Sequence, residues 1–418
     1  MTDSVEGYLM ELAILFCSLV VFATFALMPL AHKAGAPILL VVLGLGMLLG
    51  VDGPGGIRFY SYQTGFNLGS IALAIILFAG GLETERGVIR SARNSSIMMA
   101  TVGVLVTALV VGLFATYVLG MPPLVGLLLG ATVASTDAAA TFLLIQQSKR
   151  DIGDRVKNTL VLESGLNDPM AIFLVVALTT MVNGGLPTSA LEVGGFFVFL
   201  VAQIGLGLLG GIGGGRILTF LIDKMTLPNG TYPAMALAGA LAIYSAVALV
   251  GGSGFLAVYF VGIAIRNRLR RPLDNILNFN EALQWISQMA LFLMLGLLVA
   301  PSHLLKDIWA ALAVAGVLMF VARPLAVMLS IGWMGFSFRE NVFLSWVGLR
   351  GAVPVLLAIY PVITPGPVTI EFFNIVFVIV VTSLIAQGWT IVPLAHVLRL
   401  GSDKTAEEDE EREAVAET

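Results

Sequence analysis

The stretch Asn158–Val182 reads NTLVLESGLNDPMAIFLVVALTTMV and places a polar cluster at the centre of a long apolar run. At a helical rise of about 1.5 Å per residue, a run of this length crosses the hydrocarbon core of a bilayer, which is about 30 Å thick. The cluster Glu163–Asp168 falls near the midplane, where each charge costs roughly 3 kcal/mol on insertion scales. The stretch therefore predicts a transmembrane helix that carries a buried polar site.

The rest of the chain has the same apolar character. Of its 418 residues, 58% are hydrophobic and only 11% are charged, whereas a soluble domain carries about 25% charged residues. Apolar runs of about 20 residues recur from end to end, as expected for many membrane helices. Cys17 is the only cysteine, which excludes an intrachain disulfide and a cysteine-based metal or redox site. The sequence predicts an all-α polytopic membrane protein.

The apolar runs give about 13 transmembrane helices, of which the second and the ninth are unusually short. The candidate spans are Leu9–Met28, Ile38–Gly50, Leu68–Leu82, Ser96–Leu119, Leu124–Ile145, Asn158–Val182, Val193–Ile217, Tyr232–Val250, Gly254–Ile265, Leu283–Ala300, Ile308–Trp333, Asn341–Val362 and Phe372–Leu398. The first run is as long as a full span and follows acidic rather than basic residues, so no cleavable signal peptide is expected.

The Lys and Arg residues alternate between the two sides of this predicted bundle. If the N-terminus lies outside, the cytoplasmic side holds 18 of the 22, and the other side holds only Arg58 and Lys306. The positive-inside rule therefore favours an odd number of spans, with the N-terminus outside and the C-terminus cytoplasmic. The remaining two, Arg323 and Arg350, fall inside spans.

Three acids also fall inside spans: Asp137, Glu163 and Asp168. Counted from the span ends, these acids and the two arginines lie near one level of the bilayer. Intramembrane charges are costly and mark functional sites or buried pairs. We expect them to converge on a single site.

In the sixth span the polar residues form one stripe. Glu163 and Asn167 lie four residues apart, as do Ser164 and Asp168, so all four share one helix face. Pro169 removes a backbone donor and predicts a kink beside Asp168. The alternative is an interhelical hydrogen-bond cluster that only holds the bundle together.

The fifth and twelfth spans contain the other unusual segments. Ala134–Ala138 (ASTDA) is small and polar, and Gly348–Pro354 (GLRGAVP) places two glycines and a proline around Arg350. These segments lie at corresponding places in two six-span units, which is the pattern of two inverted-topology repeats with interrupted, crossing helices. Asp137 and Arg350 would neutralise the partial charges of the half-helix ends. The alternative is a pair of ordinary kinks.

Arg323 lies in an otherwise apolar span and requires an acidic partner. Glu163 is the free carboxylate at matching depth, so we expect a Glu163–Arg323 ion pair, which leaves Asp168 as the acid that can change its charge. The alternative is that Arg323 pairs with Asp137.

Five motifs together resemble the NhaP-type branch of the monovalent cation/proton antiporters. They are TDAAA (Thr136–Ala140), ESGLNDP (Glu163–Pro169), ARPLAV (Ala322–Val327), GLRGAVP (Gly348–Pro354) and QGWTIVPLA (Gln387–Ala395). Phe78–Glu83 and Gly254–Asn267 extend the likeness, which covers residues 8–399.

The resemblance implies a homodimer in which a core domain, with spans 4–6 and 11–13, moves against a dimerisation domain by alternating access. It implies that Asp168 binds the cation and the proton in turn. Thr136 and Ser164 match ligand positions, so the cation would be held by Asp168, Ser164 and Thr136. The expected cation- and proton-binding residues are Asp168, Asn167, Ser164, Thr136 and Asp137. The pair Asn167-Asp168 resembles the electroneutral group of the family.

The resemblance also assigns Glu163 and Arg323 to the core ion pair of the family. Ala138 departs from it, because many members have proline there. We expect residues 1–400 to form the membrane domain and residues 401–418 to form an acidic cytoplasmic tail; the tail has two open readings, a solvated extension and the stub of a regulatory domain.

The function expected from these residues is electroneutral, 1:1 exchange of K⁺ or Na⁺ for H⁺ by a multi-pass protein of the cell inner membrane. It is not that of an enzyme, and no cofactor and no nucleic-acid partner is expected. Two alternatives stay open. An intramembrane serine protease would use Ser253 in a GxSG pattern but needs a histidine base within reach. A passive cation channel would need a continuous polar path.

Overall fold

The computed structural model describes residues 38–137, 152–185 and 190–400, together with residues 18, 22, 26 and 141. All regular elements in these ranges are helices, and eight of them are long and apolar enough to cross a membrane. The predictions made for most of span Leu9–Met28, for Ala138 and for the acidic tail lie outside the described residues. The chain is thus a multi-pass, all-α membrane protein.

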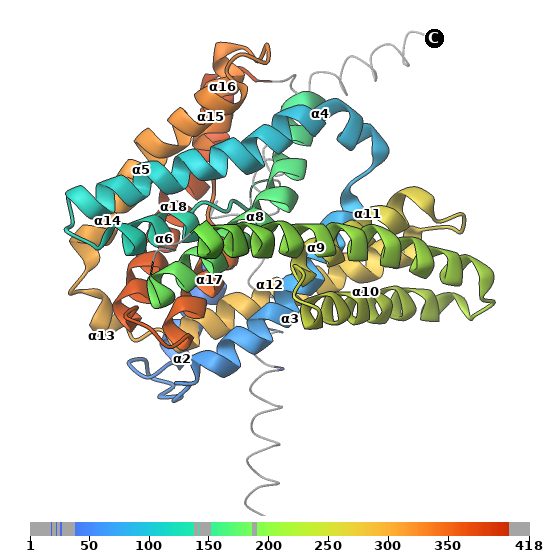
Figure 1. Ribbon diagram of the computed structural model, residues 1–418, viewed down its shortest axis with the longest axis horizontal. Coiled ribbons are helices and arrows are strands. Elements are labelled where there is room, and N and C mark those ends of the chain that lie inside the picture. The colour runs from blue at the N-terminus through green and yellow to red at the C-terminus, as the bar shows by residue number, and fades with distance from the viewer. Residues whose placement is uncertain are drawn as a thin grey trace, which may run out of the picture.

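From the second predicted span onward the described helices overlap the apolar runs (Figure 1), but α4 begins at Arg86 rather than near Ser96, and α12 begins at Asp274 rather than near Leu283. Most of the predicted fifth span after Asp137 lies outside the described residues. In chain order the described helices are α2 (Ile38–Leu49), α3 (Tyr62–Glu83), α4 (Arg86–Met98), η1 (Met99–Gly103), α5 (Val104–Tyr117), α6 (Pro123–Thr132), α8 (Asp154–Gly184), α9 (Ala190–Lys224), η2 (Asn229–Thr231), α10 (Tyr232–Leu249), α11 (Gly254–Arg268), α12 (Asp274–Leu298), α13 (Pro301–Leu304), α14 (Ile308–Val317), η3 (Leu318–Ala322), α15 (Arg323–Ile331), α16 (Phe338–Trp346), α17 (Ala352–Ile363) and α18 (Ile370–Val397).

Several spans differ in detail from the prediction. Helix α8 continues through Pro169, as membrane helices can when neighbouring groups satisfy the freed backbone carbonyl; the kink beside Asp168 stays a prediction. Helices α4 and α5 are joined by the π-helical segment η1, and α14 and α15 are joined by the π-helical segment η3. Such segments insert one residue into a helix and are frequent at functional sites. The sequence analysis did not predict them.

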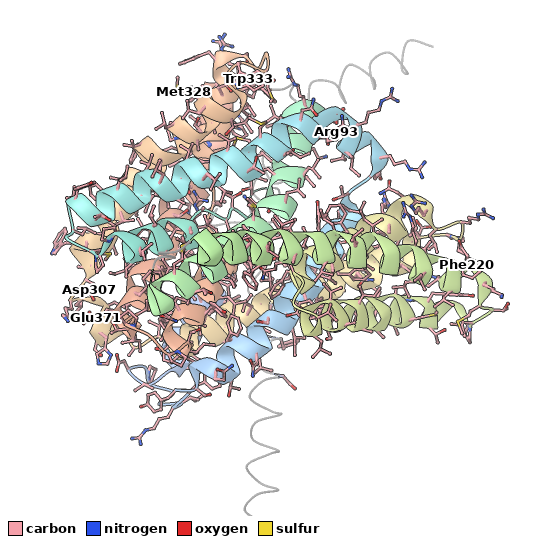
Figure 2. All side chains as sticks on the ribbon, viewed as in Figure 1. Arg93, Phe220, Asp307, Met328, Trp333 and Glu371 are labelled. Atoms are coloured by element: carbon pink, nitrogen blue, oxygen red, sulfur yellow. The ribbon has the colours of Figure 1, made fainter. Side chains whose placement is uncertain are left out.

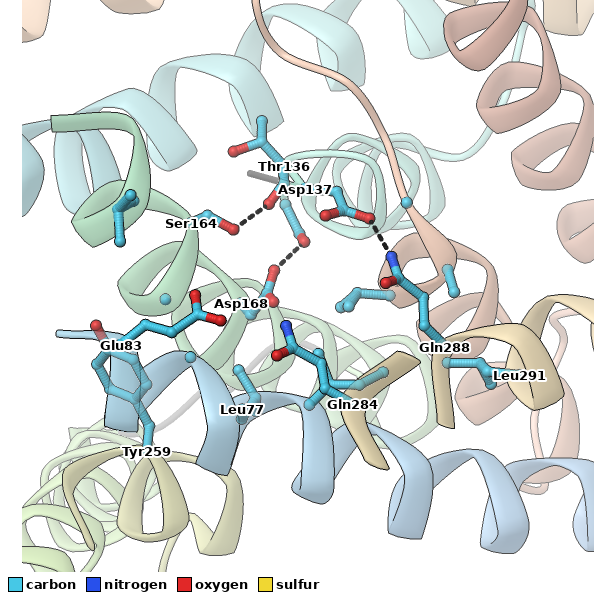
Figure 3. Close-up of a pocket in the computed structure, with 18 residues that line it drawn as sticks. Leu77, Glu83, Thr136, Asp137, Ser164, Asp168, Tyr259, Gln284, Gln288 and Leu291 are labelled. Atoms are coloured by element: carbon cyan, nitrogen blue, oxygen red, sulfur yellow. Dashed lines mark hydrogen bonds between the residues drawn. The ribbon is translucent and has the colours of Figure 1, made fainter. Parts of the chain in front are cut away.

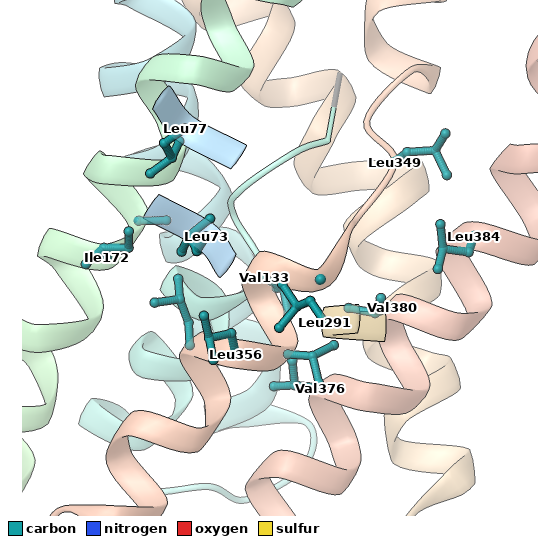
Figure 4. Close-up of a cluster of buried hydrophobic side chains, with 14 of the residues drawn as sticks. Leu73, Leu77, Val133, Ile172, Leu291, Leu349, Leu356, Val376, Val380 and Leu384 are labelled. Carbon is teal, nitrogen blue, oxygen red and sulfur yellow. The ribbon is translucent and has the colours of Figure 1, made fainter. Parts of the chain in front are cut away.

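The twelfth span is interrupted, as predicted: α16 and α17 are separated by a non-helical segment at 347–351. In the fifth span, α6 ends at Thr132 and the chain is non-helical from there to Asp137; most of the rest of that span lies outside the described residues. The two non-helical segments cross, and the Asp137 amide donates a hydrogen bond to the Leu349 carbonyl at 2.8 Å. Figure 4 shows apolar side chains packed around this crossing from α3, α8, α12, α17 and α18. The labelled residues are Leu73, Leu77, Val133, Ile172, Leu291, Leu349, Leu356, Val376, Val380 and Leu384.

The helices pack against one another throughout the bundle, and α17 packs against α3 and α12 as well as α18. Helix α11 packs against α3 and α9, and α12 packs against α2 and α3; α5 packs against α6, α4 against α8 and α17 against α18. Figure 2 shows charged side chains at opposite ends of the bundle, with Arg93 at one end and Asp307 and Glu371 at the other. Lys306 forms an exposed ion pair with Glu371, in which Nζ and Oε1 are 2.5 Å apart. The polar crossing therefore lies in the apolar middle between two charged ends.

The crossing requires glycine at position 351. A Cβ atom on Gly351 would lie 2.3 Å from Asp137 Oδ2. This is closer than non-bonded atoms approach, so either the 347–351 segment or Asp137 would have to move. We expect Gly351→Ala to destabilise the protein by about 1–3 kcal/mol through overpacking, seen as a lower midpoint of thermal denaturation in detergent. Gly316→Ala is the matched control, because Gly316 is helical with no atom near its Cβ position. The control should be neutral or stabilising by up to about 1 kcal/mol, and equal destabilisation by both changes would contradict this account of the crossing.

Candidate functional site

The charges at the crossing compensate the broken helix ends. Arg350 is 1% exposed, and its Nη1 donates to the carbonyls of Ala134 and Ser135 at 2.8 and 2.7 Å, just beyond the C-terminal end of α6. The Asp137 carboxylate lies against Gly351, at the N-terminal end of α17. A cation at a helix C-terminus and an anion at a helix N-terminus both oppose the helix dipole. The structure thus places both residues where the sequence analysis expected them.

The second arginine pairs with Glu163. Arg323 Nη1 and Nη2 donate to the two Glu163 oxygens at 2.5 and 3.1 Å, and both side chains are at most 4% exposed. This is the bidentate geometry that guanidinium and carboxylate groups favour. The alternative pairing of Arg323 with Asp137 is not seen. Asp137 instead accepts a hydrogen bond from Gln288 Nε2 at 3.2 Å.

Asp168 is held differently from Glu163. It is 6% exposed, it takes part in none of the ion pairs among the described residues, and its Oδ1 accepts a hydrogen bond from the Ser135 hydroxyl. The sequence analysis noted Ser135 as a small polar residue but gave it no role, because only the crossing brings the fifth span against α8. Asp168 is therefore a carboxylate whose charge is not matched by an adjacent arginine.

Ser164 and Asn167 hold the extended chain at Thr136. The Ser164 hydroxyl donates to the Thr136 carbonyl at 2.8 Å, and Asn167 Nδ2 donates to Thr136 Oγ1 at 2.6 Å. The stripe predicted on one face of α8 therefore meets the broken helix of the fifth span. Asn167 Oδ1 has no hydrogen-bond partner among the described residues.

A cavity of about 80 Å³ lies beside these residues (Figure 3). A water molecule occupies about 30 Å³ of liquid, so the cavity has room for a partly hydrated ion. Ser135, Thr136, Asp137, Ser164 and Asp168 line one side of it, and Asn167 is not among its lining residues.

The opposite side of the cavity comes from helices α3, α11 and α12. Glu83 of α3, Tyr259 of α11 and Gln284 and Gln288 of α12 line it. The sequence analysis missed these four as site residues, because Glu83 lies at the end of a span and the others are uncharged. Two features of the sequence could have indicated these residues. Glu83 ends the motif Phe78–Glu83, and Gln284 and Gln288 lie four residues apart on one helix face.

Proteins with a similar sequence or fold are known. Residues 20–397 match the family described as "Sodium/hydrogen exchanger, transmembrane". The chain belongs to this family. Its members are exchangers rather than enzymes, and the expected resemblance is thereby confirmed at the level of the family.

Two relatives of this exchanger-family chain are closely similar in sequence. It is 46% identical over 381 residues to the K(+)/H(+) antiporter NhaP of Alkalimonas amylolytica, which covers 91% of this chain and 66% of the relative. It is 42% identical over 376 residues to the K(+)/H(+) antiporter NhaP2 of Shewanella sp. (strain ANA-3), covering 90% of this chain and 65% of the relative. The chain therefore spans about two-thirds of the length of these relatives.

The fold of this exchanger-family chain also has a solved counterpart. The sodium proton antiporter MjNhaP1 from Methanocaldococcus jannaschii, solved at pH 8, superposes with a TM-score of 0.78 at 23% sequence identity. The match covers 94% of this chain and 100% of that chain. At this identity the similarity shows a shared fold.

The buried ion pair gives a testable prediction. Removing one partner strands a buried charge, which costs roughly 3–5 kcal/mol in measured buried pairs. Glu163→Ala and Arg323→Ala should each lower the midpoint of thermal denaturation in detergent, and the double variant should lose less than the sum of the two. Strictly additive losses would show that the two side chains do not stabilise each other.

Proposed function

We propose that this chain is a secondary active antiporter that exchanges K⁺ or Na⁺ for H⁺ by alternating access in the cell inner membrane. The observation that carries the proposal is Asp168, a buried carboxylate beside a small cavity that forms no ion pair with a described residue. Burial favours the neutral form of a carboxylate, so protons compete with a cation for it. Two relatives named K(+)/H(+) antiporters support this class of activity.

Oxygen atoms around the cavity suit the proposed cation. Hard cations prefer oxygen ligands, and Asp168, Ser164 and Thr136 supply a carboxylate, a hydroxyl and a backbone carbonyl. Ser135 orients the Asp168 carboxylate through its hydrogen bond. Asn167 donates a hydrogen bond to Thr136 and so holds the non-helical segment after α6 against α8.

Coupling follows from the cost of moving a bare charge. An ionised Asp168 with no partner is expensive to carry through a low-dielectric region, so the core moves only when Asp168 holds a proton or a cation. Glu163 is fixed against Arg323, and Arg350 is fixed against two backbone carbonyls. One acid then serves one cation and one proton in turn, which makes the exchange electroneutral.

The architecture supports the same proposal. We place 13 spans in two inverted repeats, because the interrupted helices occur in spans five and twelve, and the π-helical segments occur in spans four and eleven. These positions correspond in the two six-span units. The basic ends of the spans place the N-terminus outside and the C-terminus in the cytoplasm.

The quaternary state belongs to the proposal as well. Within residues 1–400, spans 4–6 and 11–13 form the core domain, and the remaining spans form a dimerisation domain. Helices α9 and α10 are the least buried of the eight long helices, at 17% and 28% of their apolar windows. This exposed apolar side supports a homodimer within the bilayer.

The competing functions have less support. Ser253, the candidate protease nucleophile, begins α11 and its hydroxyl accepts a hydrogen bond from the Leu256 amide at 3.3 Å, the role of a helix cap. For a passive channel, the central cavity would have to continue as a polar path, but Leu77, Val161 and Leu291 line it.

The first functional prediction concerns Asp168. Asp168→Asn keeps the volume and an oxygen that can accept from Ser135, but it removes the titratable charge, so we expect a folded protein with no exchange. Exchange is measured in proteoliposomes with an imposed pH gradient, a fluorescent pH probe and a series of K⁺, Na⁺ and Li⁺. Asp154→Asn, in the exposed first turn of the same helix, is the control and should exchange normally. Normal dissipation of the pH gradient by Asp168→Asn would remove Asp168 from the mechanism.

The second functional prediction concerns stoichiometry. With one titrating acid, a membrane potential clamped by an ionophore for an ion other than the substrate should leave the exchange rate unchanged at constant pH gradient. Asn167→Asp places a second acid beside the first and, in an active variant, should introduce voltage dependence. A rate for the unmodified protein that shifts several-fold with potential would mean that another group titrates and that exchange is not electroneutral.

A further inference from the structure

A groove of about 860 Å³ lies on the outer side of the bundle, between α15, α16 and α18. Its largely apolar lining includes five side chains that are each at least 65% exposed: Phe320, Met328, Trp333, Phe338 and Val397. Figure 2 shows Met328 and Trp333 at the periphery of the bundle, toward the end that carries Arg93. The groove is therefore an open hollow on the lipid-facing side of the protein.

The floor of the groove is ordered by Trp346, the last residue of α16. Its indole Nε1 donates to Thr390 Oγ1 of α18 at 2.8 Å, and its ring packs against that of Phe320, with the ring centroids 5.5 Å apart. Its carbonyl accepts a hydrogen bond from Gln387 Nε2 at 2.8 Å. An occupant of the groove therefore packs against the residue that directly precedes the non-helical segment at 347–351.

Basic residues border one end of the groove. Arg339 follows the lining residue Phe338, and Arg399 lies two residues after the lining residue Val397. Both arginines are exposed, and neither takes part in an ion pair with a described residue. The neighbouring acid, Glu340, already caps the N-terminal end of α16. This end of the groove therefore offers positive charge to a ligand.

An anionic phospholipid matches both the apolar lining and the basic end. Its acyl chain would fill the apolar length, and its phosphate would meet the arginines. Aromatic residues such as Trp333 and Phe338 are enriched at the level of the lipid headgroups. Basic pockets between transmembrane helices on the cytoplasmic side bind anionic headgroups, and the positive-inside rule assigns this end of the bundle to the cytoplasm.

Two other occupants match only one of these features. Residues 401–418 follow the groove directly in sequence and are strongly acidic, but Val415 is their only apolar residue larger than alanine. They complement the arginines and not the apolar lining. A second copy of the chain would dock on the exposed side of α9 and α10, which pack chiefly against α11. Figure 1 shows these two helices away from α15 and α16.

We propose that this groove binds an anionic phospholipid of the cytoplasmic leaflet, with its headgroup at Arg339 and Arg399 and an acyl chain against Trp346. The inference goes beyond the proposed exchange function and does not require it. A lipid in the groove contacts α15, α16 and α18 at once, so it holds α16 in place beside the crossing. The protein should therefore be more stable with this lipid than without it.

The binding test compares phosphatidylglycerol with phosphatidylcholine of the same acyl chains, added to delipidated protein in detergent. Native mass spectrometry should show preferential binding of phosphatidylglycerol, and the midpoint of thermal denaturation should rise with it. Arg339→Gln and Arg399→Gln remove charge at exposed positions, and each should weaken phosphatidylglycerol binding about fivefold. Arg90→Gln is the matched control, because Arg90 is an exposed arginine of α4 on the same side of the membrane and does not line the groove. It should bind both lipids as the unmodified protein does.

A structural test locates the lipid. Crystals grown with phosphatidylglycerol brominated on its acyl chains should show anomalous density between Met328 and Trp346, and the double variant Arg339→Gln, Arg399→Gln should lose it. Absence of this density, equal binding of the two lipids, or the same loss of binding in Arg90→Gln would overturn the proposal. Protein density in the groove, from residues 401–418 or from a second copy of the chain, would overturn it as well.

Discussion

The structure depends on the need to satisfy backbone groups that two interrupted helices release inside an apolar bundle. Lipid offers no hydrogen-bond partners, so other groups must replace the lost helical hydrogen bonds from within the protein. Arg350 binds two carbonyls beyond the end of α6, its own amide donates to the Ser383 hydroxyl, and Gln387 binds the Trp346 carbonyl. The Asp137 amide closes the crossing through Leu349. The polar residues at the crossing are positioned by this arrangement.

Charge balance at the crossing distinguishes the acids from one another. Glu163 is neutralised by a bidentate arginine, and Asp137 lies at the N-terminal end of α17 with Gln288 as a donor. Asp168 has a hydroxyl donor but no cationic neighbour in any ion pair of the described chain. The same segment of α8 thus carries one acid that is paired with an arginine and one that is held by a hydroxyl alone among the described side chains.

The cavity lies where the crossing meets helices from other parts of the chain. One wall comes from α8 and the two non-helical segments, and the other comes from α3, α11 and α12. Residues far apart in the sequence therefore enclose Asp168. Tyr259 lies at this boundary, where its hydroxyl is 3.3 Å from Thr84 Oγ1 and its ring is close to Gly165.

The sequence by itself determined the membrane class, the helices from the second span onward, the interruptions beside Asp137 and Arg350, and the residues of the polar stripe on α8. These follow from local properties: apolar length, the cost of intramembrane charge and the spacing of side chains on one helix. Only the tertiary structure decided that Arg323 binds Glu163 rather than Asp137, that Ser135 donates to Asp168, and that Glu83, Gln284 and Gln288 complete the cavity. Those contacts join segments far apart in the chain, and their geometry is set by how the helices cross, which no local pattern encodes.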